Sequence, residues 1–247
     1  MTIPVNLIYS FAFIPLPDCW LDGMLATLLG TILFFAPQAP DIAHLRTAPE
    51  AAQPIIERLK ADARGQPLAL LLQAQIQLEQ FHFEQAVALL EEAGRAQADL
   101  PRLQGMRGLA YFKLGRTAEA IACFEHELQR APQDFPVLYY LAAAHEKQND
   151  LPAARRHIEA ALAQQTQSAE ALTLYSQVLS KQNQFAPALA ALERVFAAQP
   201  DAANDAEKRY LRARLYQRLG RKQDAARELA AVQRLKDAAR QQEKAKP

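Results

Sequence analysis

The 247 residues carry 28 Lys and Arg against 27 Asp and Glu, so no global field draws nucleic acid or an anionic membrane to the chain. Ala (49), Leu (35) and Gln (25) dominate, whereas only 13 of the 23 Val, Ile and Thr residues lie after residue 47. This excludes a β or α/β fold, and two cysteines, Cys19 and Cys123, exclude a disulfide framework or a multi-cysteine zinc site.

The first 40 residues differ in composition from the rest, because they contain no Lys or Arg. The uncharged run Met24–Ala36 has the length of a signal-peptide hydrophobic region and is shorter than the roughly 20 residues of a spanning helix. No basic segment precedes it, and Pro37 and Pro40 crowd the cleavage point. We therefore hold two interpretations open: a signal or anchor segment that places the protein outside the cytoplasm or at a membrane, or an apolar leader packed on a cytoplasmic domain.

Residues 67 to 235 contain an internal repeat of 34 residues. Small residues recur in register, and large apolar residues follow each of them at a spacing of four. The first column is Ala86, Ala120, Ala154 and Ala188, with Ala225 after a three-residue slip, and the second is Leu90, Phe124, Ile158 and Leu192, with Leu229 after the same slip. Another small column lies twelve residues earlier, at Ala74, Gly108, Ala142, Ser176 and Ala213. Each unit is predicted to be two helices that bury their apolar faces only when neighbouring units stack.

The turns and prolines agree with this register. Between the two helices of a unit stand Gly115, Asn149, Asn183 and Gly220, residue types that accept the left-handed conformation at a helix end. Phe81 breaks this column, so we expect the first turn to be built differently. The prolines fall at helix starts or between helices: Pro67, Pro101 and Pro136 at first helices, Pro152 and Pro187 at second helices, and Pro132 and Pro200 at unit ends.

At these residues the chain resembles the tetratricopeptide repeat family, with the pattern Gly108-x2-Tyr111, Gly115, Ala120-x3-Phe124 and Pro132 as the best match. The resemblance implies an all-α right-handed solenoid of about five helix-turn-helix repeats. Three departures from the family pattern predict looser packing: no repeat has the Trp, polar Gln104 and Arg107 replace apolar residues, and His145 replaces a Tyr.

The resulting organisation has four parts. Residues 1–40 form the leader, residues 41–66 a linker and an N-terminal capping helix, residues 67–235 the repeat array, and residues 236–247 a charged tail. The five repeats are 67–100, 101–134, 135–168, 169–205 and 206–235.

We find no candidate catalytic residues, no nucleotide-binding loop and no cofactor motif, so the sequence predicts a protein without enzymatic activity. Cys123, His126 and Glu127 share one helix face, and His157 occupies the place of Cys123 in the next repeat. Because no second cysteine or paired histidine completes a metal site, we interpret them as structural residues. We likewise interpret Glu91 and Glu92 as a solvated helix face.

The resemblance also implies which residues line the concave groove, namely positions 2, 5, 9, 12 and 13 of each first helix. Position 13 holds a cation in four consecutive repeats: Lys113, Lys147, Lys181 and Arg218. Phe112, Tyr139, Tyr210 and Arg214 lie at the other lining positions, and this mixture suits an acidic or carboxylate-ended peptide. Alternatively, these cations reflect the general preference of Lys and Arg for the last turn of a helix.

We therefore predict a non-catalytic scaffold that binds a partner protein or peptide in the groove, without a small-molecule substrate. If the leader directs export, the chain resembles the envelope assembly factors built from such repeats, and membrane contact would come through the leader. The alternative is a helical-repeat RNA-binding protein, against which the neutral net charge argues.

Overall fold

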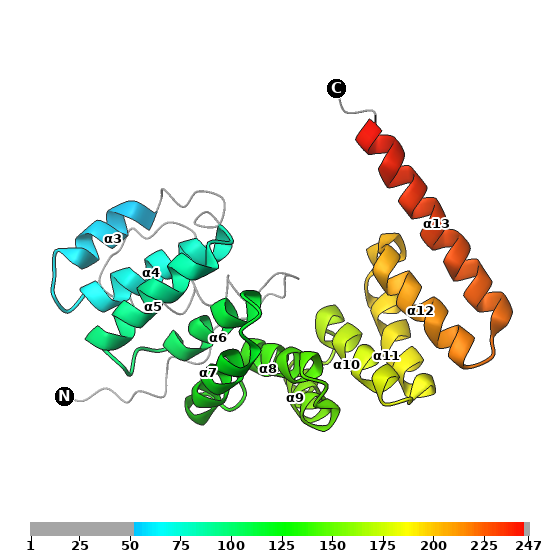
Figure 1. The fold of residues 1–247 in the computed structure, drawn as a ribbon, viewed down its shortest axis with the longest axis horizontal. Helices are drawn as coiled ribbons and strands as arrows, with labels where there is room; N and C mark the ends of the chain where they lie inside the picture. The colour runs from blue at the N-terminus through cyan, green and yellow to red at the C-terminus, as the bar shows by residue number, and fades with distance from the viewer. Residues whose placement is uncertain (1–51, 245–247) are drawn as a thin grey trace.

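The fold was analysed in a computed structural model that describes residues 52–244. The leader assigned to residues 1–40 lies outside the described residues. Within them the chain is helical, without a strand, and forms the predicted right-handed α-solenoid (Figure 1). The helices are α3 (Gln53–Lys60), α4 (Gln66–Glu79), α5 (Phe83–Ala96), α6 (Leu103–Lys113), α7 (Thr117–Arg130), α8 (Phe135–Lys147), α9 (Leu151–Gln164), α10 (Ala169–Lys181), α11 (Phe185–Ala198), α12 (Ala206–Arg218) and α13 (Lys222–Lys244), with a short 3₁₀ helix, η3, at Pro200–Asn204.

The helices pair as the 34-residue register predicts. Each pair packs internally and then against the first helix of the next pair, so contacts run mainly between sequence neighbours. The pairs are α4 with α5, α6 with α7, α8 with α9, α10 with α11, and α12 with α13. α3 packs on α4 at the N-terminal end. Together they form an arch, with α6, α8, α10 and α12 on its inner side and α7 and α9 on its outer side (Figure 1).

The small residues of the repeat are buried where the two helices of a pair meet. Ala86, Ala120, Ala154 and Ala188 have no exposed surface. A Cβ added at Gly108 would lie 2.6 Å from two ring atoms of Phe124, so this position has no room for a side chain. The small columns of the sequence therefore mark the close contacts between helices.

All five turns between paired helices use the same backbone conformation. Gly115 and Gly220 have φ of 76° and 75°, and Asn149 and Asn183 have φ of 61° and 60°. Phe81 also has a positive φ, 62°, so the prediction of a differently built first turn is wrong. The flanking helices impose this geometry, because the N–H of His82 donates to the carbonyl of Gln77 across the turn as equivalent residues do in the other repeats.

The second unit begins later than the proline pattern predicts. Pro101 does not open the helix, since α6 begins at Leu103 and Arg102 before it has a φ of 63°. The buried carboxylate of Glu127 on α7 accepts a hydrogen bond from the N–H of Gly105 at 3.0 Å. A side chain from the paired helix thus satisfies one of the free N–H groups at the start of α6.

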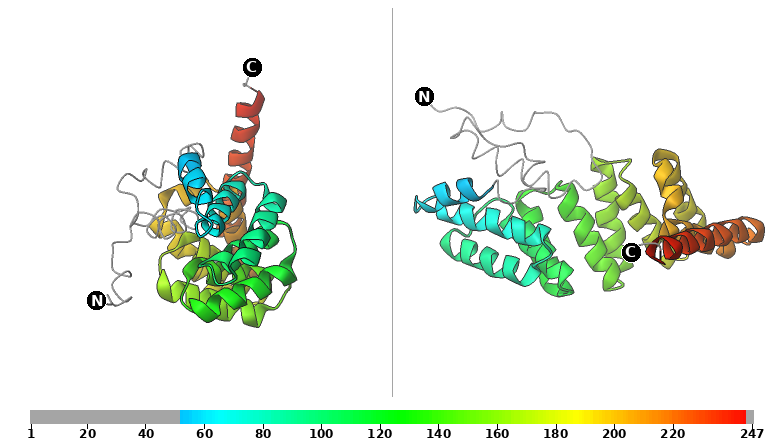
Figure 2. Two further views of the ribbon diagram at one scale, coloured as in Figure 1. Left: turned by 90° about the vertical axis from the view of Figure 1, so that its left-hand side faces the viewer. Right: turned by 90° about the horizontal axis from the view of Figure 1, so that it is seen from above.

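The C-terminal helix α13 is longer than the other helices and continues through residues 236–244, which the sequence analysis assigned to a charged tail. Ala225 and Val232 are its buried residues. Glu228 on α13 accepts hydrogen bonds from Arg209 at 2.9 Å and Arg212 at 2.7 Å, both on α12. Beyond these contacts α13 projects from the end of the arch (Figures 1 and 2).

Candidate functional site

The four cations of position 13 all end a first helix. Lys113 ends α6, Lys147 ends α8, Lys181 ends α10 and Arg218 ends α12, and all four side chains are exposed. A cation at this place interacts favourably with the negative end of the helix dipole. Their surroundings, however, differ from repeat to repeat.

Lys113 and Lys147 share a group of aromatic rings on α6 and α8, which we call the aromatic–lysine cluster: Phe112, Lys113, Tyr139, Tyr140 and Lys147. The Nζ of Lys147 lies 4.0 Å from the centre of the Phe112 ring, and the Nζ of Lys113 lies 5.9 Å from that of Tyr140. The Phe112 and Tyr140 rings meet edge to face at 5.6 Å, and those of Tyr139 and Tyr140 at 5.1 Å. The two ammonium groups therefore rest on one aromatic surface that spans two repeats.

The electrostatics of this cluster favour an anion. Partial desolvation against the neighbouring rings, and to a lesser degree the positive charge of Lys147, lower the pKa of Lys113 below its ordinary value. Burial raises the pKa of Tyr139, with a further contribution from Glu170. A carboxylate placed near the two lysines would offset their mutual repulsion while its neighbouring carbon atoms contact the rings.

The other two cations have partners of their own. Lys181 forms an ion pair with Glu146 on α8, with 2.7 Å between Nζ and Oε1. The guanidinium of Arg218 lies over the Phe185 ring, 4.8 Å from its centre. The four cations therefore differ in how free they are to bind, which their identical repeat position did not reveal.

Tyr210 and Arg214 lie on α12, apart from the aromatic–lysine cluster on α6 and α8. Tyr210 is 51% exposed, and Arg214 is exposed with no ion-pair partner among residues 52–244. Phe112, in contrast, is only 8% exposed, because it packs against Tyr140 under the ammonium of Lys147. The structure thus offers two separate groups of the expected residues rather than one continuous row.

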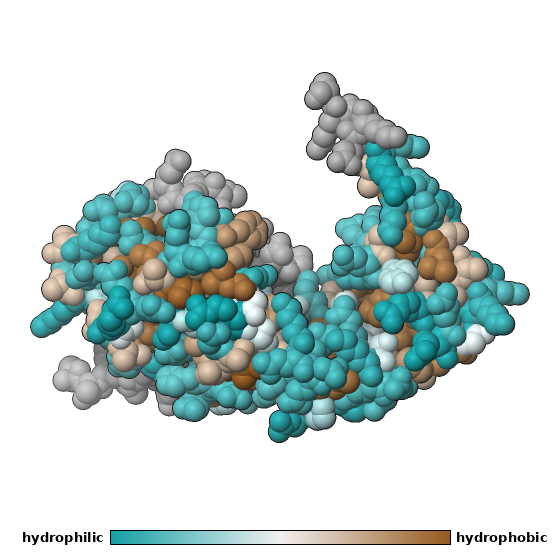
Figure 3. Space-filling view, viewed as in Figure 1, coloured by the Kyte–Doolittle hydropathy of each residue, from teal (hydrophilic) through white to brown (hydrophobic). Residues whose placement is uncertain are grey.

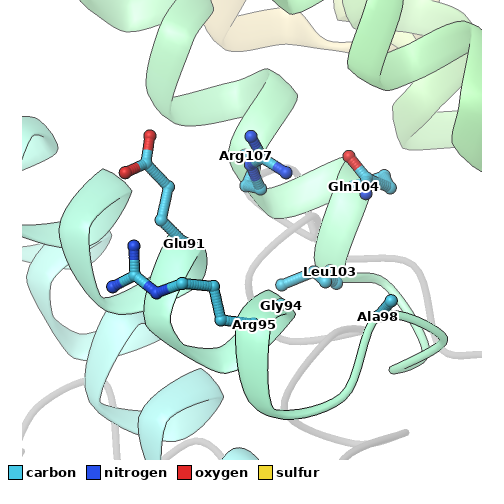
Figure 4. A pocket seen from close by; sticks show the side chains of 7 residues that line it. All are labelled: Glu91, Gly94, Arg95, Ala98, Leu103, Gln104 and Arg107. Atoms are coloured by element: carbon cyan, nitrogen blue, oxygen red, sulfur yellow. The ribbon is translucent and has the colours of Figure 1, made fainter.

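A cavity of about 350 Å³ opens between α5 and α6, where Gln104 and Arg107 replace the apolar residues of the family pattern (Figure 4). Glu91 and Arg95 line it from α5. The Nε of Arg107 is buried without a hydrogen-bond partner, and Glu91 accepts a hydrogen bond from Tyr111 at 3.2 Å. The cavity at Gln104 and Arg107 agrees with the looser packing predicted there, and Glu91 is half-buried rather than part of a purely solvated face.

His145 and His157 contact each other within one helix pair. His145 on α8 stacks on His157 on α9, with ring centres 5.4 Å apart and an angle of 9° between the planes. Burial, followed by the charges of His145 and Arg156, lowers the pKa of His157. Across residues 52–244, no three His, Cys, Asp or Glu side chains are grouped in a way that could hold a metal ion.

Comparison with known proteins identifies the family. Two sequence profiles described as tetratricopeptide repeats match the chain, one at residues 71–135 and the other at residues 111–178. The chain is a tetratricopeptide repeat protein. The matched residues begin in α4 and end in α10, so they include both helices that carry the aromatic–lysine cluster.

Solved structures share the solenoid over most of their length. MamA of Desulfovibrio magneticus RS-1, from residue 41 of that protein to its end, has 20% identity and a TM-score of 0.63, and the match covers 70% of this tetratricopeptide repeat protein and 96% of MamA. YrrB, described as a tetratricopeptide repeat protein with an unusual peptide-binding site, has 18% identity and a TM-score of 0.59 over 74% and 91% of the two chains. At these identities the likeness concerns the fold. A search of curated proteins gave no match in sequence.

Among the described helices of this tetratricopeptide repeat protein, none combines the length and the apolar character needed to cross a bilayer.

Proposed function

We propose that this protein is a non-catalytic scaffold that binds an acidic segment of a partner protein on the inner side of its arch. The aromatic–lysine cluster is the centre of this surface. Two ammonium groups from adjacent repeats lie over one set of rings, and the lowered pKa of Lys113 reflects its partial desolvation and their repulsion. An acidic residue of the partner stabilises both lysines, whereas a neutral residue does not.

The fold supports a peptide as the ligand. The inner side of the arch is lined by the first helices of successive repeats, so an extended segment meets one helix after another. The shared fold with YrrB, whose description includes a peptide-binding site, is consistent with this use. On α12, exposed Tyr210 and Arg214 supply a second contact for a segment long enough to reach the last repeat.

The test compares Lys113 and Lys147, which lie in the aromatic–lysine cluster, with Lys181, which is ion-paired to Glu146. The probe is a fluorescein-labelled peptide with Glu at alternate positions, and the readout is fluorescence anisotropy with the full chain. Lys113→Gln combined with Lys147→Gln should weaken binding by about tenfold or more and remove most of its salt dependence. Lys181→Gln should change the affinity by less than about twofold, because Glu146 already neutralises Lys181.

Two controls separate binding from folding. Gln keeps the helix propensity of Lys, so circular dichroism should show unchanged helical content. Lys222→Gln, on the exposed surface of α13 outside the cluster, should leave the anisotropy curve unchanged. Equal affinity in the double variant and the wild type would refute the cluster as the binding centre. Full loss only when Lys113, Lys147, Lys181 and Arg218 are all converted to Gln would instead support an even row of four equivalent contacts.

We further propose that residues 1–40 act as an export or anchor segment and that the protein serves as an assembly factor in the cell envelope. The support comes from the sequence, since Met24–Ala36 is an uncharged run with the length of a signal-peptide hydrophobic region. Intact mass spectrometry of protein from its host should show loss of about 36 to 39 residues, or the protein should fractionate with membranes. A soluble product that begins at Met1 would contradict this proposal.

A further inference from the structure

The near-zero net charge conceals a strong separation of charge along the array. Residues 206–247 contain thirteen Lys and Arg against five Asp and Glu. The first repeat, residues 67–100, contains one Arg against five Asp and Glu. These two regions include the last and first helix pairs, α12 with α13 and α4 with α5, which lie towards opposite ends of the arch, with α3 packed on α4 (Figure 1).

The cations of the basic end are largely available on α13. The side chains of Arg227 and Arg240 are 77% and 72% exposed, and among residues 52–244 they form ion pairs only at 3.7 Å and 3.8 Å, with acids on the same helix. Lys236 is exposed and has no ion-pair partner among the described residues. Most of the surface of α13 is accordingly hydrophilic in the space-filling view (Figure 3).

The acids of the first repeat are also available. Glu84 and Glu92 lie on α5, and Asp99 follows it; all three are exposed. None of their carboxylates has an ion-pair partner among residues 52–244. The acidic end therefore presents unpaired negative charge, as the basic end presents unpaired positive charge.

The basic end also has an unpartnered helix surface. Within the described array, α5, α7, α9 and α11 each pack against the first helix of the next pair, whereas no following helix covers α13. Leu229 on α13 is 36% exposed, and Leu235 is half-buried. In Figure 3 one patch of apolar residues lies where α13 meets the array, and a broader one lies at the end formed by α3 to α5.

We propose that the basic α12–α13 end of one molecule docks on the acidic first repeat of a second copy, head to tail. The first repeat of this chain supplies negative charge that complements the basic end, so neither a nucleic acid nor an anionic bilayer is needed as the partner. α13 carries no aromatic residue to stack on bases or to enter a bilayer interface, and its half-exposed leucines suit packing against another helix. Because the two surfaces differ, the contact is heterologous and leads to open chains of molecules rather than a closed dimer.

Charge reversal at each end provides the test. The tail-reversed variant combines three substitutions on α13: Arg227→Glu, Lys236→Glu and Arg240→Glu. The head-reversed variant combines three substitutions in the first repeat: Glu84→Lys, Glu92→Lys and Asp99→Lys. The control is Glu125→Lys, which reverses an exposed acid on α7 outside the first repeat. Circular dichroism and thermal melts establish that all variants fold as the wild type does.

Sedimentation velocity of the full chain measures association. In about 50 mM salt the weight-average mass of the wild type and of Glu125→Lys should rise with concentration, and about 500 mM salt should return both to monomers. Each triple variant alone should weaken association by about a hundredfold, because the net charge of residues 206–247 falls from +8 to +2 in the tail-reversed variant and that of residues 67–100 changes from −4 to +2 in the head-reversed variant. An equimolar mixture of the two triple variants should associate again, since the unaltered acidic first repeat of the tail-reversed variant then meets the unaltered basic end of the head-reversed variant.

Three results would overturn the proposal. The wild type could remain monomeric in low salt, the triple variants could associate as strongly as the wild type, or their mixture could fail to associate. Two other ligands of the basic end, a nucleic acid and an anionic bilayer, are tested with a single-stranded RNA 20-mer and with vesicles of phosphatidylserine and phosphatidylcholine. Binding of either probe by a wild-type protein that stays monomeric, with loss in the tail-reversed variant alone, would assign the basic end to a polyanion instead.

Discussion

Phe81 has the left-handed backbone conformation that Gly or Asn has at the same turn of the other four repeats. Substituting Phe81 therefore measures the energetic cost of a side chain in this conformation. Phe81 is 76% exposed, so removing its side chain loses roughly a quarter of the burial of an aromatic residue, about 50 Å² or about 1 kcal/mol. A residue with a Cβ costs about 1 kcal/mol more than Gly in this conformation. Phe81→Gly should therefore have nearly the stability of the wild type, and Phe81→Ala should be about 1 kcal/mol less stable.

The turn determines whether Ala or Gly gives the more stable protein at position 81. At an ordinary helical position Gly is the less stable choice by about 1 kcal/mol, as we expect for Ala88→Gly on the exposed surface of α5. Urea unfolding followed by circular dichroism measures the midpoints, and melting temperatures should separate Phe81→Gly from Phe81→Ala by about 2 to 4 °C. A Phe81→Ala variant as stable as Phe81→Gly would show that the positive φ at this turn is not a source of strain.

Three further predictions concern the repeat contacts. Ala142→Leu should overpack the contact of α8 with α9 and cost about 1 to 3 kcal/mol in chemical unfolding; an unchanged midpoint would contradict the register. Glu127→Ala should cost about 1 to 2 kcal/mol in thermal unfolding, because the N–H of Gly105 loses its carboxylate, whereas Glu127→Gln should cost less. Since the pKa of His157 is lowered in the folded state, its protonation opposes folding: stability is fully present above the unfolded pKa of about 6.5 and falls as the pH drops towards the folded pKa. His157→Gln should reduce this loss between about pH 7.5 and pH 5.5, and an unaltered pH profile would exclude His157 as its source.

The helix pairs could be predicted because two independent signals coincide. The small residues fix where helices touch, and Gly115 and Asn149 mark where the chain turns back. Residue preference failed at Phe81 because the hydrogen bonds between flanking helices outweigh the local cost of a positive φ. It failed again at Pro101, where Arg102 takes the turn conformation and the carboxylate of Glu127 meets the start of the helix.

The position of the cations could be predicted, but their environment could not. The repeat places Lys113, Lys147 and Lys181 at equivalent helix ends, as the structure shows. Side chains of the neighbouring repeat decide whether each ammonium contacts a ring or a carboxylate. The 34-residue spacing does not specify these side chains. Glu146 illustrates this, since it follows the residue that replaces a family Tyr and reaches forward to Lys181.

The length of α13 has a consequence for how a contact at this end could be detected. A helix of 23 residues extends about 35 Å, whereas the 13 residues of α12 beneath it extend about 20 Å. Among residues 222–241 of α13, Val232 is the last that is buried, so the residues that follow it have little tertiary support. Isolated helical turns open readily in water, and the amide protons of this part should exchange with solvent far faster than those around Ala225. A partner that binds this end of α13 will slow the exchange, so hydrogen exchange of these amides can detect whether the end is bound.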